Sequence, residues 1–311
     1  MTTPRTDRFF MAGCQRSGTT MLRLVLECHP EIFCLDEDTS YPALMCGECP
    51  KPAGQKLTGF KVPRWSEQFD ASAAQDNGEE AVARNFYQGQ PIIYLVREVR
   101  DTVASMLKLK MTETQTWLEY CARPILESKI AQPAFAKQYA PDIEQLRASG
   151  NAWPKVGALY WKYKTEPLFR YQQLGWPVLL IRYEDLVESP GWHLRHIVDF
   201  LGLEWNDRLL EHDRLPHAEI YPDGTAMGNT DPRKPINDES VGQWRRMLGP
   251  KEEASILEMA GDLPKRLGYT VRQPGLRQQI RQLWDRVVQV TSFKRHLRPV
   301  GDARASGGRI G

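Results

Sequence analysis

The chain has 311 residues, of which 41% are hydrophobic and 26% charged, and its formal net charge at pH 7 is +2. These values are typical of a globular protein with one sizeable core, and they exclude a disordered chain, a collagen and a small disulfide-bonded scaffold. A net charge so close to zero also argues against a surface that coats nucleic acid.

The apolar runs and the cysteines indicate where in the cell the protein is expected. The longest apolar runs, near residues 92–96 and 178–181, are much shorter than the roughly 18 residues that a membrane-spanning helix needs. The polar residues 1–7 do not resemble the start of a secretory signal. Cys46 and Cys49 have zinc-like spacing, but no second pair of ligands accompanies them. We therefore expect a cytoplasmic protein with reduced thiols and no bound metal.

Short apolar strands alternate with amphipathic helices, which is the pattern of a parallel sheet covered by helices. The predicted strands are residues 9–14, 32–35, 57–62, 90–96 and 177–182. The predicted helices are residues 20–28, 79–88, 100–111 and 192–203. Between the last two strands, residues 112–175 are predicted to form a helical lobe. Four prolines in residues 213–238 indicate a long ordered loop.

Residues 13–20, with the sequence GCQRSGTT, have the spacing of a phosphate-binding loop and lie between a predicted strand and a predicted helix. In such a loop the backbone N–H groups point into one concavity at a helix N-terminus, where the helix dipole favours an anion. Thr19 stands where a P-loop NTPase has its lysine, and Arg97, not a magnesium-binding acid, follows the later strand. The loop is therefore predicted to bind a phosphate-like group that is not metal-bound ATP.

Arg97 and Ser105 form a second candidate anion site. Arg97 ends the strand of residues 90–96 and Ser105 lies two turns into the next helix, so both can reach a phosphate in the crevice where open α/β sheets bind ligands. An arginine at a strand end is also commonly an ion-paired surface residue. Together, the elements predict an α/β fold, a three-layer domain like that of the P-loop NTPases, with a central parallel sheet flanked by helices and a helical insertion.

The order of four segments resembles the sulfotransferases that use 3′-phosphoadenosine 5′-phosphosulfate (PAPS). These segments are residues 14–20 (CQRSGTT), 94–105 (YLVREVRDTVAS), 182–186 (RYEDL) and 242–246 (GQWRR). The resemblance spans about residues 9–270 and is nearest to the tyrosylprotein sulfotransferase type. The features shared with that type are the loop arginine followed by His29-Pro30 and Asp36-Glu37, and the segment Lys234-Pro-Ile-Asn237.

The resemblance implies which residues bind the nucleotide. The loop that holds the 5′-phosphosulfate is matched by Arg16, Ser17, Gly18, Thr19 and Thr20. Arg97 and Ser105 match the pair that holds the 3′-phosphate, and Tyr183 matches a tyrosine at the adenine. Arg233 and Lys234 belong to a segment that folds over the nucleotide.

Two further residues, Glu37 and Lys61, match the catalytic base and the lysine beside the bridging oxygen. In sulfuryl transfer the acceptor hydroxyl loses a proton while charge builds on the leaving phosphate. Glu37 would take the proton, and Lys61, helped by Arg16, would stabilise the departing 3′,5′-diphosphoadenosine without a metal. Asp36 is a competing base, and residues 36–38 could instead be a solvated acidic turn.

The resemblance does not extend to the acceptor. Glu37 and Lys61 are only 24 positions apart, which is shorter than in the tyrosylprotein enzymes, and Gln243 stands where those enzymes have a lysine. We therefore expect a hydroxyl acceptor that could be a carbohydrate, a small molecule or a phenol. Tyr41 and Trp65 are among the aromatic residues that could line its pocket.

Residues 272–311 contain nine arginines or lysines and two aspartates, a net charge of +7. Apolar residues at positions 280, 283, 284 and 287 predict an amphipathic helix here, which either docks on its own core or contacts anionic lipid. We therefore divide the chain into a sulfotransferase domain, residues 1–271, and a basic C-terminal helix and tail, residues 272–311.

Two other functions fit parts of the pattern. A magnesium-dependent small-molecule kinase could use the same loop, although the missing lysine argues against it. A non-catalytic nucleotide-binding protein would bind diphosphoadenosine without turnover. The oligomeric state is not predicted.

Overall fold

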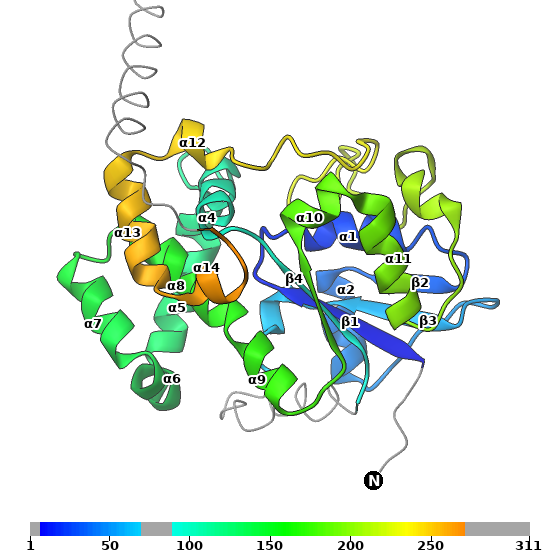
Figure 1. The fold of residues 1–311 in the computed structure, drawn as a ribbon, viewed down its shortest axis with the longest axis horizontal. Coiled ribbons are helices and arrows are strands. Elements are labelled where there is room, and N and C mark those ends of the chain that lie inside the picture. Colours follow the sequence, from blue (N-terminus) through cyan, green and yellow to red (C-terminus); the bar gives the residue numbers. More distant parts are fainter. Residues whose placement is uncertain (1–6, 70–88, 271–311) are drawn as a thin grey trace, which may run out of the picture. The chain divides into compact units, whose positions relative to one another are not determined.

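A five-stranded parallel sheet in the order β2-β3-β1-β4-β5 organises the fold of this computed structural model, which describes residues 7–69 and 89–270 (Figure 1). The strands are β1 (Arg8–Gly13), β2 (Ile32–Leu35), β3 (Leu57–Lys61), β4 (Ile92–Val96) and β5 (Val178–Arg182). Each pairs in parallel with its neighbours, so the predicted strands and their parallel arrangement are confirmed. The predicted helix 79–88 and the segment 272–311, with its proposed membrane contact, lie outside the described residues.

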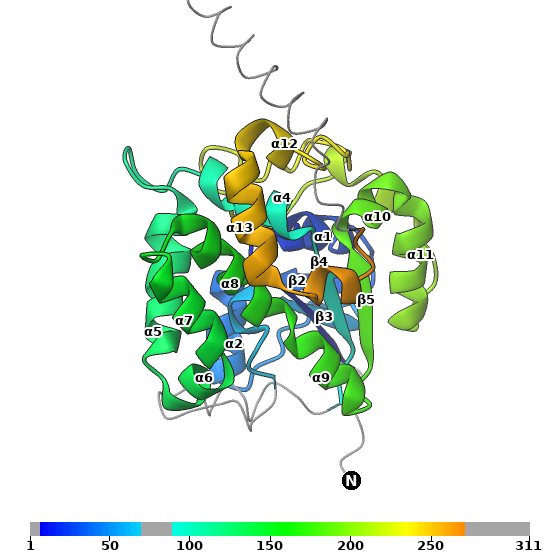
Figure 2. The same ribbon diagram turned by 60° about the vertical axis from the view of Figure 1, so that its left-hand side comes forward.

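Alternate residues of each strand face opposite layers of helices, and this alternation places the core on both sides of the sheet. Phe9 and Met11 of β1 pack with helices α1 (Thr19–Leu26), α10 (Tyr183–Glu188) and α11 (Pro190–Phe200). Phe10 and Ala12 face the opposite layer. That layer contains α2 (Glu37–Met45), α4 (Val99–Lys108), α8 (Trp153–Thr165) and α13 (Pro250–Ala260). The two layers enclose the sheet (Figure 2), which confirms the three-layer α/β fold class.

The middle of the chain is helical, as predicted. It contains a π-helical turn (Leu118–Ala122) and the helices α5 (Arg123–Ile130), α6 (Pro133–Gln138), α7 (Ala140–Ala148) and α9 (Pro167–Gln173), in addition to α8. Helix α8 packs against α4 and α13, and the fully buried Trp161 donates from its indole nitrogen to the carbonyl oxygen of Arg97 at 3.0 Å. The lobe therefore fixes the backbone at the end of β4.

Strand order places a crevice between β1 and β4. The chain passes from β1 through α1 to one half of the sheet, and it later returns to add β4 and β5 on the other side of β1. In open α/β sheets such a reversal is where ligands bind, beyond the carboxyl ends of the strands. The loop after β1 and the residues after β4 therefore meet at one place.

The predicted long loop covers this edge of the sheet. Residues 215–238 contain no helix or strand, and their one β-bridge joins Ala226 to Thr230. Short helices flank the loop: 3-10 turns at Asp207–Leu210 and His212–Arg214 precede it, and α12 (Trp244–Met247) and later α14 (Leu263–Arg266) follow it. Pro63–Trp65 forms a further 3-10 turn after β3.

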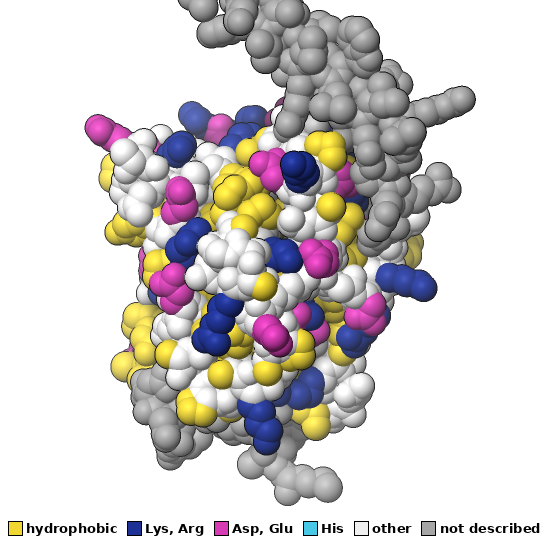
Figure 3. All heavy atoms as spheres, turned by 90° about the vertical axis from the view of Figure 1, so that its left-hand side faces the viewer, with side chains coloured by type: hydrophobic (Ala, Val, Ile, Leu, Met, Phe, Trp, Pro, Cys, Tyr) yellow, Lys and Arg dark blue, Asp and Glu magenta, His cyan; other side chains and the backbone are white. Residues whose placement is uncertain are grey.

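Surface charge is mixed on the face that carries α7 and α13. Figure 3 shows basic and acidic side chains interspersed with hydrophobic ones on this face, without a field of one sign. Within residues 7–69 and 89–270, no helix has the length and apolar character needed to cross a bilayer.

Candidate active site

The loop after β1 adopts a backbone conformation that favours glycine at several positions. Gly13, Arg16 and Gly18 all have positive φ angles, of 137°, 72° and 96°. A Cβ at Gly13 would lie 2.1 Å from the Leu95 carbonyl oxygen, and one at Gly18 would lie 2.6 Å from the Tyr183 ring. Arg16 holds this conformation despite having a side chain, which is a form of strain that proteins concentrate at functional sites.

The same loop presents polar groups that lack partners. Gly18 is the N-cap of α1 and provides no side-chain cap, so the first turn of the helix is open to an anion. The Ser17 hydroxyl is completely buried and has no hydrogen-bond partner within the described chain. A buried hydroxyl without a partner is costly, so this loop fits a ligand with oxygen acceptors.

Arg16, Arg97, Ser105 and Tyr183 converge beside this loop, as predicted. Arg16 Nε donates to Ser105 Oγ at 3.3 Å, and Arg97 Nη1 donates to the Arg16 carbonyl oxygen at 3.2 Å. The Arg97 guanidinium lies over the Tyr183 ring, 4.7 Å from its centroid. The four side chains therefore form one cluster drawn from the loop, β4, α4 and α10.

The two arginines of the cluster repel each other. Burial and the neighbouring charge of Arg97 lower the pKa of Arg16 to about 10. Among the described residues, no carboxylate forms an ion pair with either arginine, and Arg97 Nε has no hydrogen-bond partner there. Half-buried Arg16 and buried Arg97 are neighbouring cations without an acid, and a bound anion would stabilise them, so the cluster fits a phosphate or sulfate group.

A cleft of about 1140 Å³ contains this cluster. Its lining includes Arg16, Gly18, Thr19, Thr20, Arg97, Ser105, Tyr183 and Lys234 from the predicted set, together with Lys108, His212, Tyr221, Asn237 and Arg246. The size and the many basic groups suit a nucleotide with more than one anionic group. Buried His212 has no partner for either ring nitrogen within the described chain, and sequence reasoning did not identify it.

Glu37 and Lys61 lie beside the cleft lining and not in it. Lys61 Nζ forms an ion pair at 2.6 Å with Asp36, not with Glu37. Glu37 Oε1 instead lies 3.3 Å from Arg64 Nε and accepts from Gln15 Nε2 at 3.4 Å. Since Gln15 belongs to the loop of residues 13–20, Glu37 contacts this loop directly.

The two neighbouring carboxylates differ electrostatically. Burial raises the pKa of Glu37 above its usual range, although Lys61 and Arg64 act in the opposite direction. Burial also acts to raise the pKa of Asp36, but Lys61 and Arg23 outweigh it, so that the pKa is lowered. Neither residue is more than 5% exposed, so the interpretation of both as part of a solvated turn is wrong.

Arg233 and Lys234, which were predicted to cover the nucleotide, lie at different positions relative to the cleft. The Arg233 side chain is 75% exposed, pairs with Asp231 at 3.1 Å and does not line the cleft. Lys234 does line it, and its Nζ donates to Glu239 at 3.2 Å. The backbone of the long loop contacts the site elsewhere, where Gly228 accepts from Arg16 Nη1 at 3.0 Å.

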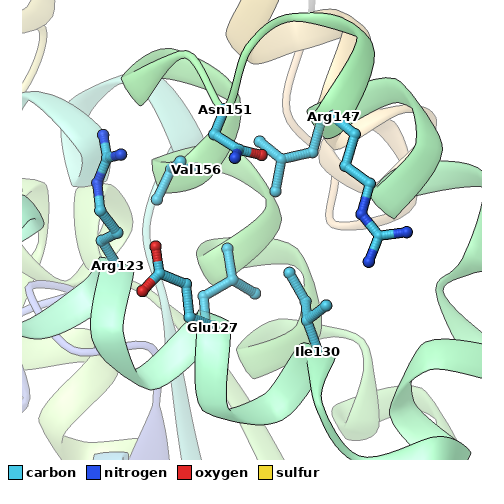
Figure 4. Close-up of a pocket in the computed structure, with 8 residues that line it drawn as sticks. Arg123, Glu127, Ile130, Arg147, Asn151 and Val156 are labelled. Atoms are coloured by element: carbon cyan, nitrogen blue, oxygen red, sulfur yellow. The ribbon is translucent and has the colours of Figure 1, made fainter.

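Other candidate sites are less developed. A cavity of about 210 Å³ lies among α5, α7 and α8, lined by Arg123, Leu126, Glu127, Ile130, Leu146, Arg147, Asn151 and Val156 (Figure 4). Cys46 is exposed and Cys49 half-buried, and both are free thiols. In the described ranges, no group of three or more histidine, cysteine, aspartate or glutamate side chains could hold a metal ion.

Comparison with known families shows which family the chain belongs to. The profile of the family described as "Sulfotransferase domain" matches residues 88–260, more than half of the chain. The chain belongs to the sulfotransferase family. The enzyme class predicted from the loop, Arg97, Ser105 and the RYEDL segment is thereby confirmed.

Named relatives cover most of this sulfotransferase. Protein-tyrosine sulfotransferase A of Caenorhabditis elegans is 22% identical over 85% of this chain and 68% of its own length. Protein-tyrosine sulfotransferase 2 of Gallus gallus is 25% identical over 84% of this chain and 68% of its own. The tyrosylprotein type identified from the sequence motifs is thus also represented among the relatives.

Solved structures share the fold. A sulfotransferase domain from the curacin biosynthetic pathway superposes with a TM-score of 0.57, at 15% identity, over 87% of this chain and 100% of that domain. A mouse sulfotransferase complexed with PAP gives a TM-score of 0.51 at 19% identity, over 85% of this chain and 89% of that one. These likenesses confirm the sulfotransferase fold.

Proposed function

We propose that this sulfotransferase transfers the sulfuryl group of PAPS to a hydroxyl acceptor. The observation that carries the proposal is the pair of arginines, half-buried Arg16 and buried Arg97, which share one cleft without a carboxylate partner among the described residues. The mouse relative by fold was crystallised with PAP. PAPS carries a phosphosulfate at one end and a separate phosphate at the other, which matches two cationic positions in one cleft.

The chain's residues divide between the two ends of the nucleotide. Residues 16–20 would hold the 5′-phosphosulfate, because the uncapped start of α1 is there, although Ser17 itself is completely buried and does not line the cleft. Arg97 and Ser105 would hold the 3′-phosphate. Tyr183 would support the adenine, and the segment of Arg233 and Lys234 would cover the nucleotide. No metal is required for this binding, because the cations are supplied by the protein.

Glu37 is the proposed base. During transfer the sulfur–oxygen bond to the 5′-phosphate breaks, a bond to the acceptor oxygen forms, and the proton of the acceptor hydroxyl passes to a carboxylate. A base with a raised pKa accepts a proton more readily near neutral pH. Asp36, already bound to Lys61 at 2.6 Å and holding a lowered pKa, is better suited to orient Lys61 toward the leaving phosphate.

Aromatic residues lie near the base. Tyr41 and Trp65 stack with their ring centroids 4.7 Å apart, and Arg64 lies between the Trp65 ring and Glu37. Trp161, by contrast, is fully buried in the core. We place the acceptor beside Tyr41 and Arg64, where its hydroxyl can approach Glu37. A phenol, a carbohydrate or another small hydroxyl compound fits this description, and the named relatives act on protein tyrosine.

The direct test is transfer of labelled sulfuryl from PAPS to a panel of phenols, sugars and tyrosine peptides. Label in at least one acceptor, without phosphoryl transfer from magnesium ATP, is the expected result. Phosphoryl transfer alone would replace the proposal with a kinase.

We also propose the cytoplasm as the location, supported by six cysteines that are all free thiols.

The pH dependence of turnover distinguishes the two candidate bases. The base must be ionised, so kcat falls as the pH falls through its pKa. Because burial raises the pKa of Glu37, the acid limb of the kcat profile is expected above the value of about 4.3 that is usual for glutamate. An acid limb below that value would assign the role to Asp36, whose pKa is lowered.

A further inference from the structure

A chain of buried charged side chains links the long loop to Lys61. His217 Nδ1 lies 2.5 Å from Glu27 Oε1, and Glu27 Oε2 lies 2.7 Å from Arg23 Nη1. Arg23 Nε lies 3.5 Å from Asp36 Oδ2, and Asp36 Oδ1 lies 2.6 Å from Lys61 Nζ. None of these five side chains is more than 9% exposed. Glu27 and Asp36 each therefore contact two nitrogen-bearing side chains in the protein interior.

The two ring nitrogens of His217 each contact an oxygen atom. Nδ1 faces the Glu27 carboxylate, and Nε2 lies 2.7 Å from the carbonyl oxygen of His212. Nδ1 is therefore the contact through which His217 holds one carboxylate oxygen of Glu27, while Arg23 holds the other.

The loop makes further contacts with the same residues. The Ala218 carbonyl oxygen accepts from Arg23 Nη1 at 3.3 Å, and Glu219 Oε2 accepts from the Asp36 backbone N–H at 2.7 Å. Met227 Sδ lies 3.2 Å from Lys61 Nζ. Residues 217–228 thus reach both ends of the charged chain.

We propose that Glu27 and His217 position Lys61 for the transfer reaction, acting through Arg23 and Asp36. The inference rests on the proposed function, in which Lys61 stabilises the leaving phosphate. The Asp36 carboxylate contacts both Arg23 and Lys61. The position of Lys61 therefore depends on how strongly Arg23 attracts that carboxylate. Glu27, held by His217, satisfies Arg23 from the other side. Without Glu27, Asp36 is the one carboxylate left beside the buried Arg23 guanidinium among the described residues, and Arg23 draws it away from Lys61.

Two substitutions of His217 separate this role from simple packing. His217→Asn places an amide nitrogen near the position of Nδ1 and keeps a donor to Glu27. His217→Gln places its amide nitrogen near the position of Nε2, so it keeps a donor to the His212 carbonyl and loses the one to Glu27. Glu27→Gln keeps the shape of Glu27 and removes its charge. His196→Gln, at an exposed position on α11, is the matched control.

Two readouts test the proposal on the full chain. The first is the rate of reductive methylation of Lys61, followed by peptide mass spectrometry, which needs neither PAPS nor an acceptor. The second is the steady-state kinetics of sulfuryl transfer. His217→Gln and Glu27→Gln should each raise the methylation rate several-fold and lower kcat about tenfold, with an unchanged KM for PAPS. His217→Asn and His196→Gln should stay within about threefold of the wild type in both.

Equal methylation of Lys61 in His217→Gln, His217→Asn and the wild type would overturn the proposal. So would a parallel loss of kcat in both His217 variants, since that indicates packing and not the contact with Glu27. If the wild type transfers no sulfuryl group to any acceptor, the proposed function fails. The methylation rates still decide whether Glu27 and His217 hold Lys61 in place.

Discussion

Arg97→Ala is expected to weaken binding of 3′,5′-diphosphoadenosine by about 10²- to 10³-fold, equivalent to about 3–4 kcal/mol. Arg97 is 4% exposed, lies over Tyr183 and has an Nε without a partner among the described residues. Its removal takes away the cation proposed to bind the 3′-phosphate and leaves that phosphate buried beside Ser105. Isothermal titration calorimetry of the wild type and the variant measures the difference.

Arg245→Ala is the matched control for this substitution. Arg245 is exposed on α12, stacks on Trp244 and does not line the cleft. Its removal should change the dissociation constant by less than about threefold. Binding by Arg97→Ala within threefold of the wild type, with an unchanged melting temperature without ligand, would remove Arg97 from the nucleotide site.

Glu37→Gln is expected to reduce kcat by about 10²- to 10⁴-fold, the usual contribution of a general base. Glutamine keeps the size of the side chain and its contact with Gln15, but it cannot take the acceptor's proton. Diphosphoadenosine affinity should stay within about threefold, because Glu37 does not line the cleft that holds the nucleotide.

Asp38→Asn is the control for the loss of charge at this turn. Asp38 follows Glu37, its side chain is 65% exposed and it contacts Arg64 at 3.4 Å. Its substitution should leave kcat nearly unchanged. Full activity of Glu37→Gln would exclude Glu37 as the base and direct attention to Asp36.

The sheet could be predicted because its central strands, β1, β3 and β4, are buried on both faces. Ile92–Val96 is a continuous apolar run between polar segments, and such runs are typical of parallel strands covered by helices. The conformation of the loop after β1 could be predicted because its glycines stand where the backbone takes positive φ. Both features depend on local sequence.

The arrangement around Glu37 could not be predicted from local sequence. Residues 36–38 form an acidic run, and Pro42 argues against a helix beginning there. In the structure Asp36 is the N-cap of α2, and its side chain accepts from the Glu37 N–H. What decides burial is Lys61 from β3 and Arg23 from α1, which arrive from distant parts of the chain.

The pairing of Lys61 with Asp36 also depends on contacts between distant parts of the sequence. The family resemblance associates Lys61 with the leaving group and Glu37 with the acceptor, but it does not indicate which carboxylate the lysine contacts. One signal was available: Arg23 and Glu27 are charged residues four positions apart on a helix that is otherwise largely apolar. Charges at such positions are buried only when other charges meet them.

The most direct test of the central claim is thermal unfolding of the wild type with diphosphoadenosine, compared with magnesium ATP. A ligand at 100 times its dissociation constant stabilises the folded state by about 2.7 kcal/mol. We predict this stabilisation with diphosphoadenosine and little or none with magnesium ATP. Stabilisation by magnesium ATP alone, or by neither ligand, would contradict the assignment of the Arg16 and Arg97 cleft to PAPS.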